Sequence, residues 1–163
     1  MAQIRESDEN QSGDLLVKEK SFRKLLDGFK ASMKRAFHRE DEIDRFCSAR
    51  GIPPSVLNEL MSENPLSLCI PKQYGGFGGN VKENMAFISA ASYESLALSL
   101  TLGINNALFI QPVAKYGQDK VKPEIFNQFL NESRMGGLMI TEPGFGSDAL
   151  NMQTSFSEKD GFY

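Results

Sequence analysis

The sequence contains few of the residues that build metal centres or disulfide frameworks. Its 163 residues include two cysteines, Cys47 and Cys69, one histidine, His38, and no tryptophan. A structural zinc site requires four nitrogen or sulfur ligands at short spacings, so three candidates without a CxxC motif exclude one. The cysteines are therefore predicted to be small apolar side chains in a reducing compartment, which favours a cytoplasmic protein.

The sequence also lacks an excess of positive charge and an apolar leader. Its 18 basic and 21 acidic side chains give a formal net charge of −3. Nucleic acids and anionic membranes favour a surplus of lysine and arginine, so neither is expected as the main partner. Because Met1–Gly13 is polar and acidic with no apolar core, it resembles neither a signal nor a transit peptide, and we expect a flexible N-terminal tail over residues 1–14.

Charged residues are concentrated at the start of the chain. Residues 1–50 contain 11 basic and 10 acidic side chains, whereas residues 51–163 contain 7 and 11. From Leu15 to Ser48 apolar residues recur at helical spacing, which predicts an amphipathic helix packed on a core by one side. His38 lies in its charged part and is predicted to be solvated rather than a catalytic base. The apolar side comprises Phe22, Leu25, Leu26, Phe29, Met33 and Phe37.

Helical signals continue to residue 135. Gly51 and Pro53-Pro54 predict a stop followed by a new helix over residues 55–63. Asn80 and Glu83 have the spacing of an N-terminal capping pair, and Lys122-Pro123 is typical of a helix start. The predicted inward-facing residues of the short helices are Val56, Leu57, Leu60, Met61, Ile125, Phe126, Phe129 and Leu130.

The segment Met85–Ala114 carries a single charged residue, Glu94. It is long enough for a membrane span, but eight serine, threonine, asparagine and glutamine side chains are too many for a lipid-facing helix. We predict no membrane span. The segment is instead predicted to form two helices that are buried on several sides and broken near Gly103, with Pro112 kinking or restarting the second.

The helical periodicity ends after residue 135. Leu138–Thr141 and residues 152–157 are predicted strands, with a hairpin turn at 159–161 and a third strand beginning at Phe162. The loop between the first two contains Pro143 and two glycines, which can direct backbone N–H groups toward one ligand. From this chemistry alone, a ligand-binding loop and an ordinary connection stay equally open.

A second glycine-rich segment contains Gly75, Gly76, Gly78 and Gly79. Four glycines in five positions exclude a helix or a central strand. They supply positive φ angles or permit the close approach of a backbone or a ligand. The segment is not a GxGxxG motif and no strand–turn–helix pattern surrounds it, so a dinucleotide-binding turn is excluded.

Gly136–Asp148, with the sequence GGLMITEPGFGSD, resembles the flavin-binding signature of the acyl-CoA dehydrogenase family. Ile70–Gly78 is similar to that family's Pro-Glu-Glu-Tyr-Gly-Gly-x-Gly segment, and the spacing from Tyr116-Gly117 to Ile140 also matches. The resemblance covers roughly residues 15–163. The sequence departs from the family at Lys72, where an acidic residue is usual, and at Phe145, which is bulkier than the common Ala or Asn and would narrow access to the phosphates.

The resemblance implies a mainly α fold followed by the start of a β-barrel domain. Residues 15–135 would form the N-terminal helical domain and residues 136–163 a truncated beginning of the middle β domain. A C-terminal four-helix domain would complete the family's fold, with FAD between the domains.

The resemblance also implies site residues. The family's flavin-contacting strand and loop fall on Leu138, Met139, Ile140, Thr141, Gly146 and Ser147. Ile140 and Thr141 would lie beside the isoalloxazine ring, where hydrogen-bond donors favour the reduced, anionic flavin. Gly146 and Ser147 would face the FAD phosphates and the start of the substrate. The floor of the acyl cavity falls on Leu100, Thr101 and Ile104, and apolar Ile104 favours an acyl chain over a polar substrate.

The implied activity is α,β-dehydrogenation of an acyl-CoA thioester in fatty acid metabolism. Electrons would pass to electron-transfer flavoprotein or a similar acceptor, and a homo-oligomer, dimer or tetramer, is expected. The family's glutamate base lies in its C-terminal domain and no residue here matches it; Glu142 is predicted to be a structural hydrogen-bond acceptor. No catalytic residue and no metal ligand is therefore assigned, and this chain alone is expected to be inactive.

Two alternatives stay open. An acyl-CoA oxidase or flavin monooxygenase shares the same helices and loop but reacts with oxygen. A non-catalytic helical module would instead use the apolar segment Met85–Ala114 to bind a partner.

Overall fold

A computed structural model of the chain describes residues 2–38 and 52–161, with side chains from Val17 onward, Ala149 excepted. This part is mainly helical, as the sequence predicts, and none of its residues belongs to a strand. Cys47, the predicted helix end at Ser48 and the predicted strand at Phe162 lie outside the described residues. The α-helices are α1 (Ala2–Phe37), α3 (Pro54–Met61), α4 (Val81–Glu94), α5 (Leu96–Gly103), α6 (Gln111–Tyr116) and α7 (Lys122–Asn131).

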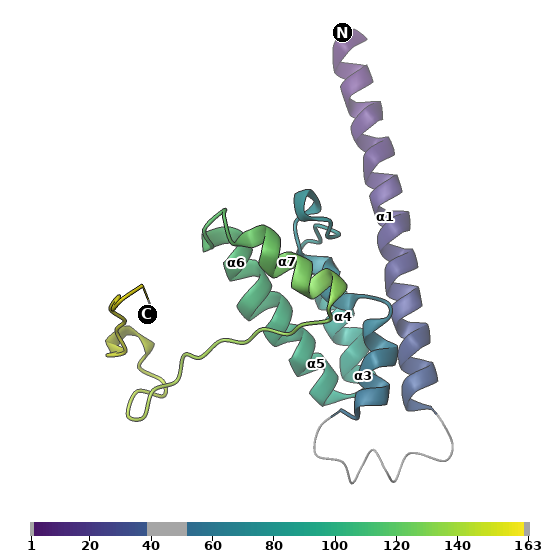
Figure 1. Cartoon of the computed structure of the whole chain (residues 1–163). Coiled ribbons are helices and arrows are strands. Elements are labelled where there is room, and N and C mark those ends of the chain that lie inside the picture. Colours follow the sequence, from purple (N-terminus) through teal and green to yellow (C-terminus); the bar gives the residue numbers. More distant parts are fainter. Residues whose placement is uncertain (1, 39–51, 162–163) are drawn as a thin grey trace.

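Short helical turns connect these elements. Three are 3-10 helices, η1 (Pro65–Cys69), η2 (Lys72–Tyr74) and η4 (Ala149–Asn151), and one is a π-helix, η3 (Ile104–Ile110). Figure 1 shows α3, α4, α5, α6 and α7 gathered beside one half of α1, whose N-terminal half projects beyond them. The chain that follows α7 runs away from this helical body.

The long helix α1 begins earlier than the sequence predicts. Helix is expected from Leu15, with a flexible tail before it, but α1 is helical from Ala2. The polar segment before Leu15 contains no proline, and Gly13 alone does not end the helix. The predicted apolar side of α1 is confirmed, because Phe29 and Met33 are buried and Phe22, Leu25, Leu26 and Phe37 pack against the core.

Aromatic rings join α1 to α4. Phe29 and Phe87 are both fully buried and stacked, with ring centroids 5.0 Å apart, and Phe22 lies 6.0 Å from Phe87. On the other side of α1, Arg35 Nε donates to Glu59 Oε1 of α3 at 2.7 Å. Ion pairs at this degree of exposure contribute little, so the rings supply most of the contact energy.

The inward-facing residues of the shorter helices are also confirmed. Val56, Leu60 and Met61 of α3 and Phe126 and Phe129 of α7 are buried, while Leu57, Ile125 and Leu130 pack against the core. The predicted capping pair forms as well, because Asn80 Oδ1 accepts from the Glu83 backbone N–H and Glu83 Oε2 accepts from that of Asn80.

The predicted break near Gly103 is wrong. The chain breaks at Ser95, whose φ of −156° and ψ of 120° end α4 and begin α5, and whose hydroxyl accepts from Leu98 N–H. Gly103 has helical angles and lies where the Ile88 side chain of α4 approaches. Before Pro112 the helix widens into η3, because proline lacks the N–H donor that an α-helix requires.

Residues Leu96–Tyr116 therefore form one helical run of 21 residues that is long and apolar enough to cross a membrane. A helix in the core of a globular protein satisfies the same two criteria, so length and composition assign no membrane to it.

The glycine-rich loop folds back on the chain before it. Gly76 accommodates the main chain, because a Cβ on it would lie 2.1 Å from the Ile70 carbonyl oxygen. Gly75 and Gly78 have φ angles of 87° and 68°, which favour glycine. The backbone N–H groups of Gly78 and Gly79 donate to the carbonyls of Ile70 and Leu68. Backbone packing therefore explains these glycines, with no ligand required.

The predicted strands after residue 135 are not confirmed. Leu138–Thr141 and residues 152–157 form no strand in the described chain, and an isolated β-bridge joins Glu142 to Phe145. A strand needs a neighbouring strand to satisfy its backbone N–H and C=O groups. A local sequence pattern does not show whether such a neighbour is present. The predicted turn does form, with positive φ at Asp160 and Gly161.

We predict that Gly76→Ala destabilises the helical body by at least about 2 kcal/mol, because the new Cβ would overlap the Ile70 main chain. Gly137→Ala is the matched control, since a Cβ there meets nothing within 4 Å. Urea unfolding followed by circular dichroism measures both. Equal midpoints for the two variants would contradict the close approach.

Candidate functional site

One side of the helical run Leu96–Tyr116 is apolar and uncovered. Leu96, Leu100, Ile104 and Leu108 are four residues apart and exposed, with Leu100 at 57% and Ile104 at 40%. Residues at this spacing share one side of a helix. We call these four residues the apolar stripe. Two of them, and the half-buried Thr101 beside them, are the residues predicted to form the acyl floor.

The opposite side of the same helix is buried and carries two asparagines. Asn106 is fully buried and donates through Nδ2 to Asn84 Oδ1 of α4 at 3.1 Å. Asn105, 3% exposed, donates through Nδ2 to the Thr101 carbonyl at 2.8 Å. Side-chain amides thus satisfy polar groups around the π-helix η3. In the described part of the chain, Asn106 Oδ1 has no partner.

The chain that follows α7 meets this helix at Gly136. Its backbone N–H donates to Asn105 Oδ1 at 2.8 Å. A Cβ on Gly136 would lie 2.3 Å from the Phe109 ring, which stacks on Phe129 of α7 with centroids 5.4 Å apart. We call Asn105, Phe109 and Gly136 the Gly136 contact. It places the start of the predicted flavin-binding segment beside the helix that carries the predicted acyl floor.

The predicted flavin-binding residues themselves are exposed. Leu138, Met139 and Ile140 are open to solvent, as are Thr141, Gly146 and Ser147. Figure 1 shows this segment extending away from the helices. The structure therefore brings together Leu100, Thr101 and Ile104 and ties them to Gly136, but it does not bring residues 138–147 onto them.

Glu142 organises the loop after Ile140. Its two carboxylate oxygens accept from the backbone N–H groups of Gln153 at 2.9 Å and Thr154 at 2.7 Å. The hydrogen bond from Gln153, and then those from Thr154, hold the pKa of Glu142 below its ordinary value. Its predicted role as a structural acceptor is confirmed. Gly144, with φ of 121°, allows the turn that follows.

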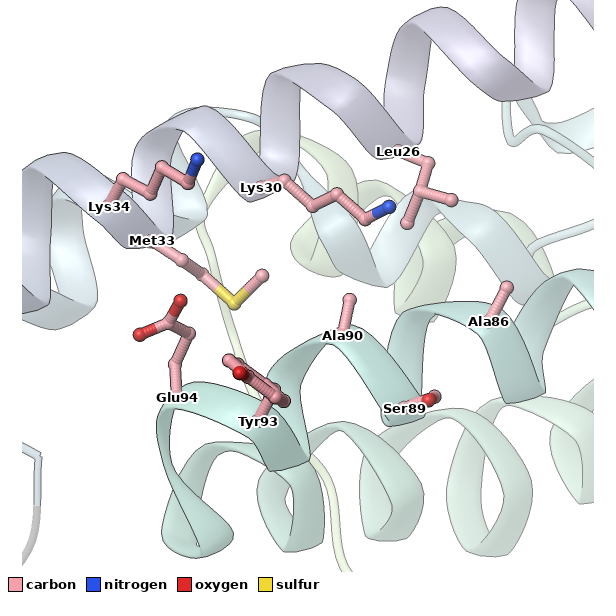
Figure 2. Close-up of a pocket in the computed structure, with 9 residues that line it drawn as sticks. All are labelled: Leu26, Lys30, Met33, Lys34, Ala86, Ser89, Ala90, Tyr93 and Glu94. Carbon is pink, nitrogen blue, oxygen red and sulfur yellow. The ribbon is translucent and has the colours of Figure 1, made fainter.

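A cavity of about 530 Å³ lies elsewhere, between α1 and α4. Figure 2 shows Lys30 and Lys34 of α1 on one side and Ala86 and Ala90 of α4 on the other, with Met33 pointing inward. The small α4 side chains leave this space open. None of the predicted site residues lines it, so it is separate from the predicted site.

Other reactive groups have structural surroundings. His38 Nε2 lies 2.6 Å from Glu94 Oε2, which joins the ends of α1 and α4. Burial raises the pKa of the Cys69 thiol, which keeps it protonated and unreactive. Among residues 2–38 and 52–161, no group of three or more His, Cys, Asp or Glu side chains could hold a metal.

Asn105 and Phe109 were not among the residues that the sequence singled out as a site. The available signal was two adjacent asparagines inside an otherwise apolar run. A polar pair in such a setting needs buried partners, but its partner at Gly136 is 31 residues away and is set only by folding.

Comparison with known proteins gives one family. Residues 19–133 match the family described as "Acyl-CoA dehydrogenase, N-terminal domain". An "Acyl-CoA dehydrogenase" of Bacillus subtilis is 25% identical over 111 residues, which cover 68% of this chain and 29% of that protein. The mitochondrial isovaleryl-CoA dehydrogenase of Bos taurus is 29% identical over 98 residues, 60% of this chain and 23% of that protein.

A third relative is named as a reductase rather than a dehydrogenase. The "3-(aryl)acrylate reductase" of Clostridium sporogenes is 24% identical over 123 residues, 76% of this chain and 32% of that protein. The chain thus spans about a quarter to a third of the length of these curated relatives. No solved structure matches the chain significantly.

We predict that the contacts of Glu142 persist at neutral pH and are lost on acidification. Because the folded-state pKa of Glu142 is lowered, these contacts stabilise the loop above the ordinary glutamate pKa and disappear as pH falls through the folded value. The amide NMR shifts of Gln153 and Thr154 should titrate with a midpoint below the ordinary value of 4.5. Glu142→Gln should remove the titration; a midpoint at or above 4.5 would contradict it.

Proposed function

The chain belongs to the acyl-CoA dehydrogenase family, and on that premise we propose that it is the N-terminal portion of an FAD-dependent enzyme that dehydrogenates an acyl-CoA thioester between Cα and Cβ. One observation supports this most directly. The Gly136 contact places the start of the flavin-signature segment beside the helix whose exposed side carries Leu100 and Ile104. A flavin segment that starts next to an apolar floor suits an acyl chain that is oxidised by flavin.

The donor chemistry of residues 138–147 fits FAD. Thr141 and Ser147 present exposed hydroxyls, and within the described residues no hydrogen bond engages the N–H groups of Leu138–Thr141. These donors suit the oxygen and nitrogen acceptors of a flavin ring and its phosphates. When bound, FAD supplies the acceptor for a hydride.

The residues of this chain would bind and orient rather than transfer protons. We propose that the backbone and side chains of Leu138, Met139, Ile140 and Thr141 hold the flavin ring, and that Gly146 and Ser147 face the phosphates. Leu100, Thr101 and Ile104 would exclude water from the acyl chain. Glu142 is unsuited to be the base, because backbone donors stabilise its ionised form and so weaken its basicity.

The remaining partners are proposals from the family. They comprise an acyl-CoA thioester substrate, electron-transfer flavoprotein or a similar electron acceptor, and assembly as a homo-oligomer. A role in fatty acid metabolism is likewise proposed from the family, whereas a cytoplasmic location is proposed from the two cysteines.

Three other functions would use the same surfaces. An oxidase or monooxygenase would differ in its reaction with oxygen, and the relative named as a reductase points to the reverse direction of the same redox chemistry. A non-catalytic module is supported only by the exposure of the apolar stripe, which marks an interface of some kind.

Anaerobic titration of the purified full-length protein separates these functions. Bound flavin that is bleached by saturated acyl-CoA and reoxidised slowly by oxygen is the expected result. Fast reoxidation by oxygen would favour the oxidase or monooxygenase. Bleaching by a chemical reductant and recovery only with an α,β-unsaturated acid would favour the reductase, and absence of flavin would leave the binding module.

We predict that Ile104→Glu raises the KM for a straight-chain acyl-CoA by about tenfold or more, since an ionised group would face the acyl chain. Leu108→Glu is the matched control, because Leu108 is similarly exposed on the apolar stripe but lies one turn beyond the predicted floor. Steady-state kinetics of the full-length protein measures both. Equal effects of the two variants on KM would remove Ile104 from the acyl floor.

A further inference from the structure

We propose that Asn105 is a positioning residue that sets the place of the flavin-binding segment relative to the acyl floor. The effect of Asn105 on flavin rests on the proposed function, whereas the contact itself rests on hydrogen bonds within this chain. Asn105 is buried. It acts through two main-chain groups, the carbonyl of Thr101 and the N–H of Gly136.

The two ends of the Asn105 side chain have different partners. Its Nδ2 donates to the carbonyl of Thr101 at 2.8 Å, and its Oδ1 accepts from the N–H of Gly136 at 2.8 Å. A donor faces a carbonyl and an acceptor faces an N–H, so the amide orientation is settled by its partners. One buried amide thus bridges a residue of the predicted acyl floor and the start of the flavin segment.

The ring of Phe109 completes this contact from the same helical turn. It lies against Gly136 so closely that any side chain there would overlap it, and it is held in place by stacking on Phe129 of α7. Gly136 is therefore pinned from two directions, by a hydrogen bond and by a ring. A Cβ on the next residue, Gly137, would meet nothing within 4 Å, so this close packing is found at Gly136 and not at its neighbour.

Leu138, the first predicted flavin residue, follows Gly136 by only two residues. At about 3.3 Å per extended residue, this short reach makes the position of Gly136 a strong constraint on where the flavin segment begins. The π-helix η3 starts at Ile104, in the acyl floor, and contains both Asn105 and Phe109. A shift of this turn by the acyl chain would therefore move the flavin segment with it.

Amide hydrogen exchange on the chain 1–163 tests the contact without flavin. In the unmodified chain the Gly136 amide should be protected and those of Leu138 and Met139 should not. Asn105→Leu should lower Gly136 protection about fivefold, the factor for one hydrogen bond of about 1 kcal/mol. Asn105→Asp keeps the acceptor for Gly136 and, once its carboxyl is protonated, a donor for the Thr101 carbonyl, so at acidic pH it should retain the protection.

Asn106→Leu is the matched control, because it also removes a buried amide from η3 but its partner is Asn84 of α4. It should leave Gly136 protected. An unprotected Gly136 in the unmodified chain would overturn the inference even if Asn105→Leu does not fold. Equal loss of protection in Asn105→Leu and Asn106→Leu would overturn it too, by showing general destabilisation.

The full-length protein tests the consequence for flavin. Asn105→Leu should shift the visible flavin absorption band and lower kcat about fivefold or more, whereas Asn106→Leu should change neither. A flavin band and kcat that respond alike to Asn105→Leu and Asn106→Leu would refute positioning while the dehydrogenase function stands. Absence of flavin from the unmodified protein would refute the proposed function, while the Gly136 protection pattern would still decide the contact.

Discussion

The stacking of Phe29 on Phe87 is the contact on which the helical body depends. Both rings are fully buried, and they join the long, highly charged helix α1 to α4. α4 in turn packs along α5, and the amide pair Asn84–Asn106 adds one hydrogen bond between α4 and the π-helix η3. Aromatic stacking adds to the burial of two large apolar surfaces. α4 is therefore the central element, because it contacts both α1 and the helix that carries the predicted acyl floor.

That helix must satisfy two opposite requirements at once. One side faces the core and carries Asn105 and Asn106, whose amides need partners because buried polar groups are costly when unpaired. The other side, the apolar stripe, is left uncovered by the described residues. The π-helix η3 carries residues of both sides and ends just before Pro112, where an α-helix would lose an N–H donor. The π-helix thus begins at Ile104, a residue that the proposed function assigns to the acyl floor.

Much of this fold could be predicted from the sequence because the signals are local. The apolar spacing of α1, the capping pair Asn80 and Glu83 and the apolar side of α7 each depend on residues within one or two turns. The resemblance at Gly136–Asp148 indicates the same family as the match over residues 19–133, which does not include that segment. The break near Gly103 was predicted wrongly because a glycine was weighted above Ser95, whose hydroxyl caps the following helix.

The candidate site was less predictable, since its parts lie far apart in the chain. Helical spacing puts Leu100 and Ile104 on one side of a helix, but their exposure contradicts the expected burial of this segment, and no local pattern indicates that Gly136 meets Asn105 and Phe109. A short apolar run at residues 138–141 and alternation at residues 152–157 predict strands that are not formed in the described chain, because a strand requires pairing with a second segment.

The sequence by itself determined the helices, their buried sides and the family, because periodicity, capping residues and motif spacing are written along the chain. Only the tertiary structure decided the purpose of the glycines and the asparagines. Gly76 is required by the main chain of Ile70, and Gly136 by the ring of Phe109. Close approach and buried hydrogen bonding depend on which distant segments meet, and that is settled when the chain folds.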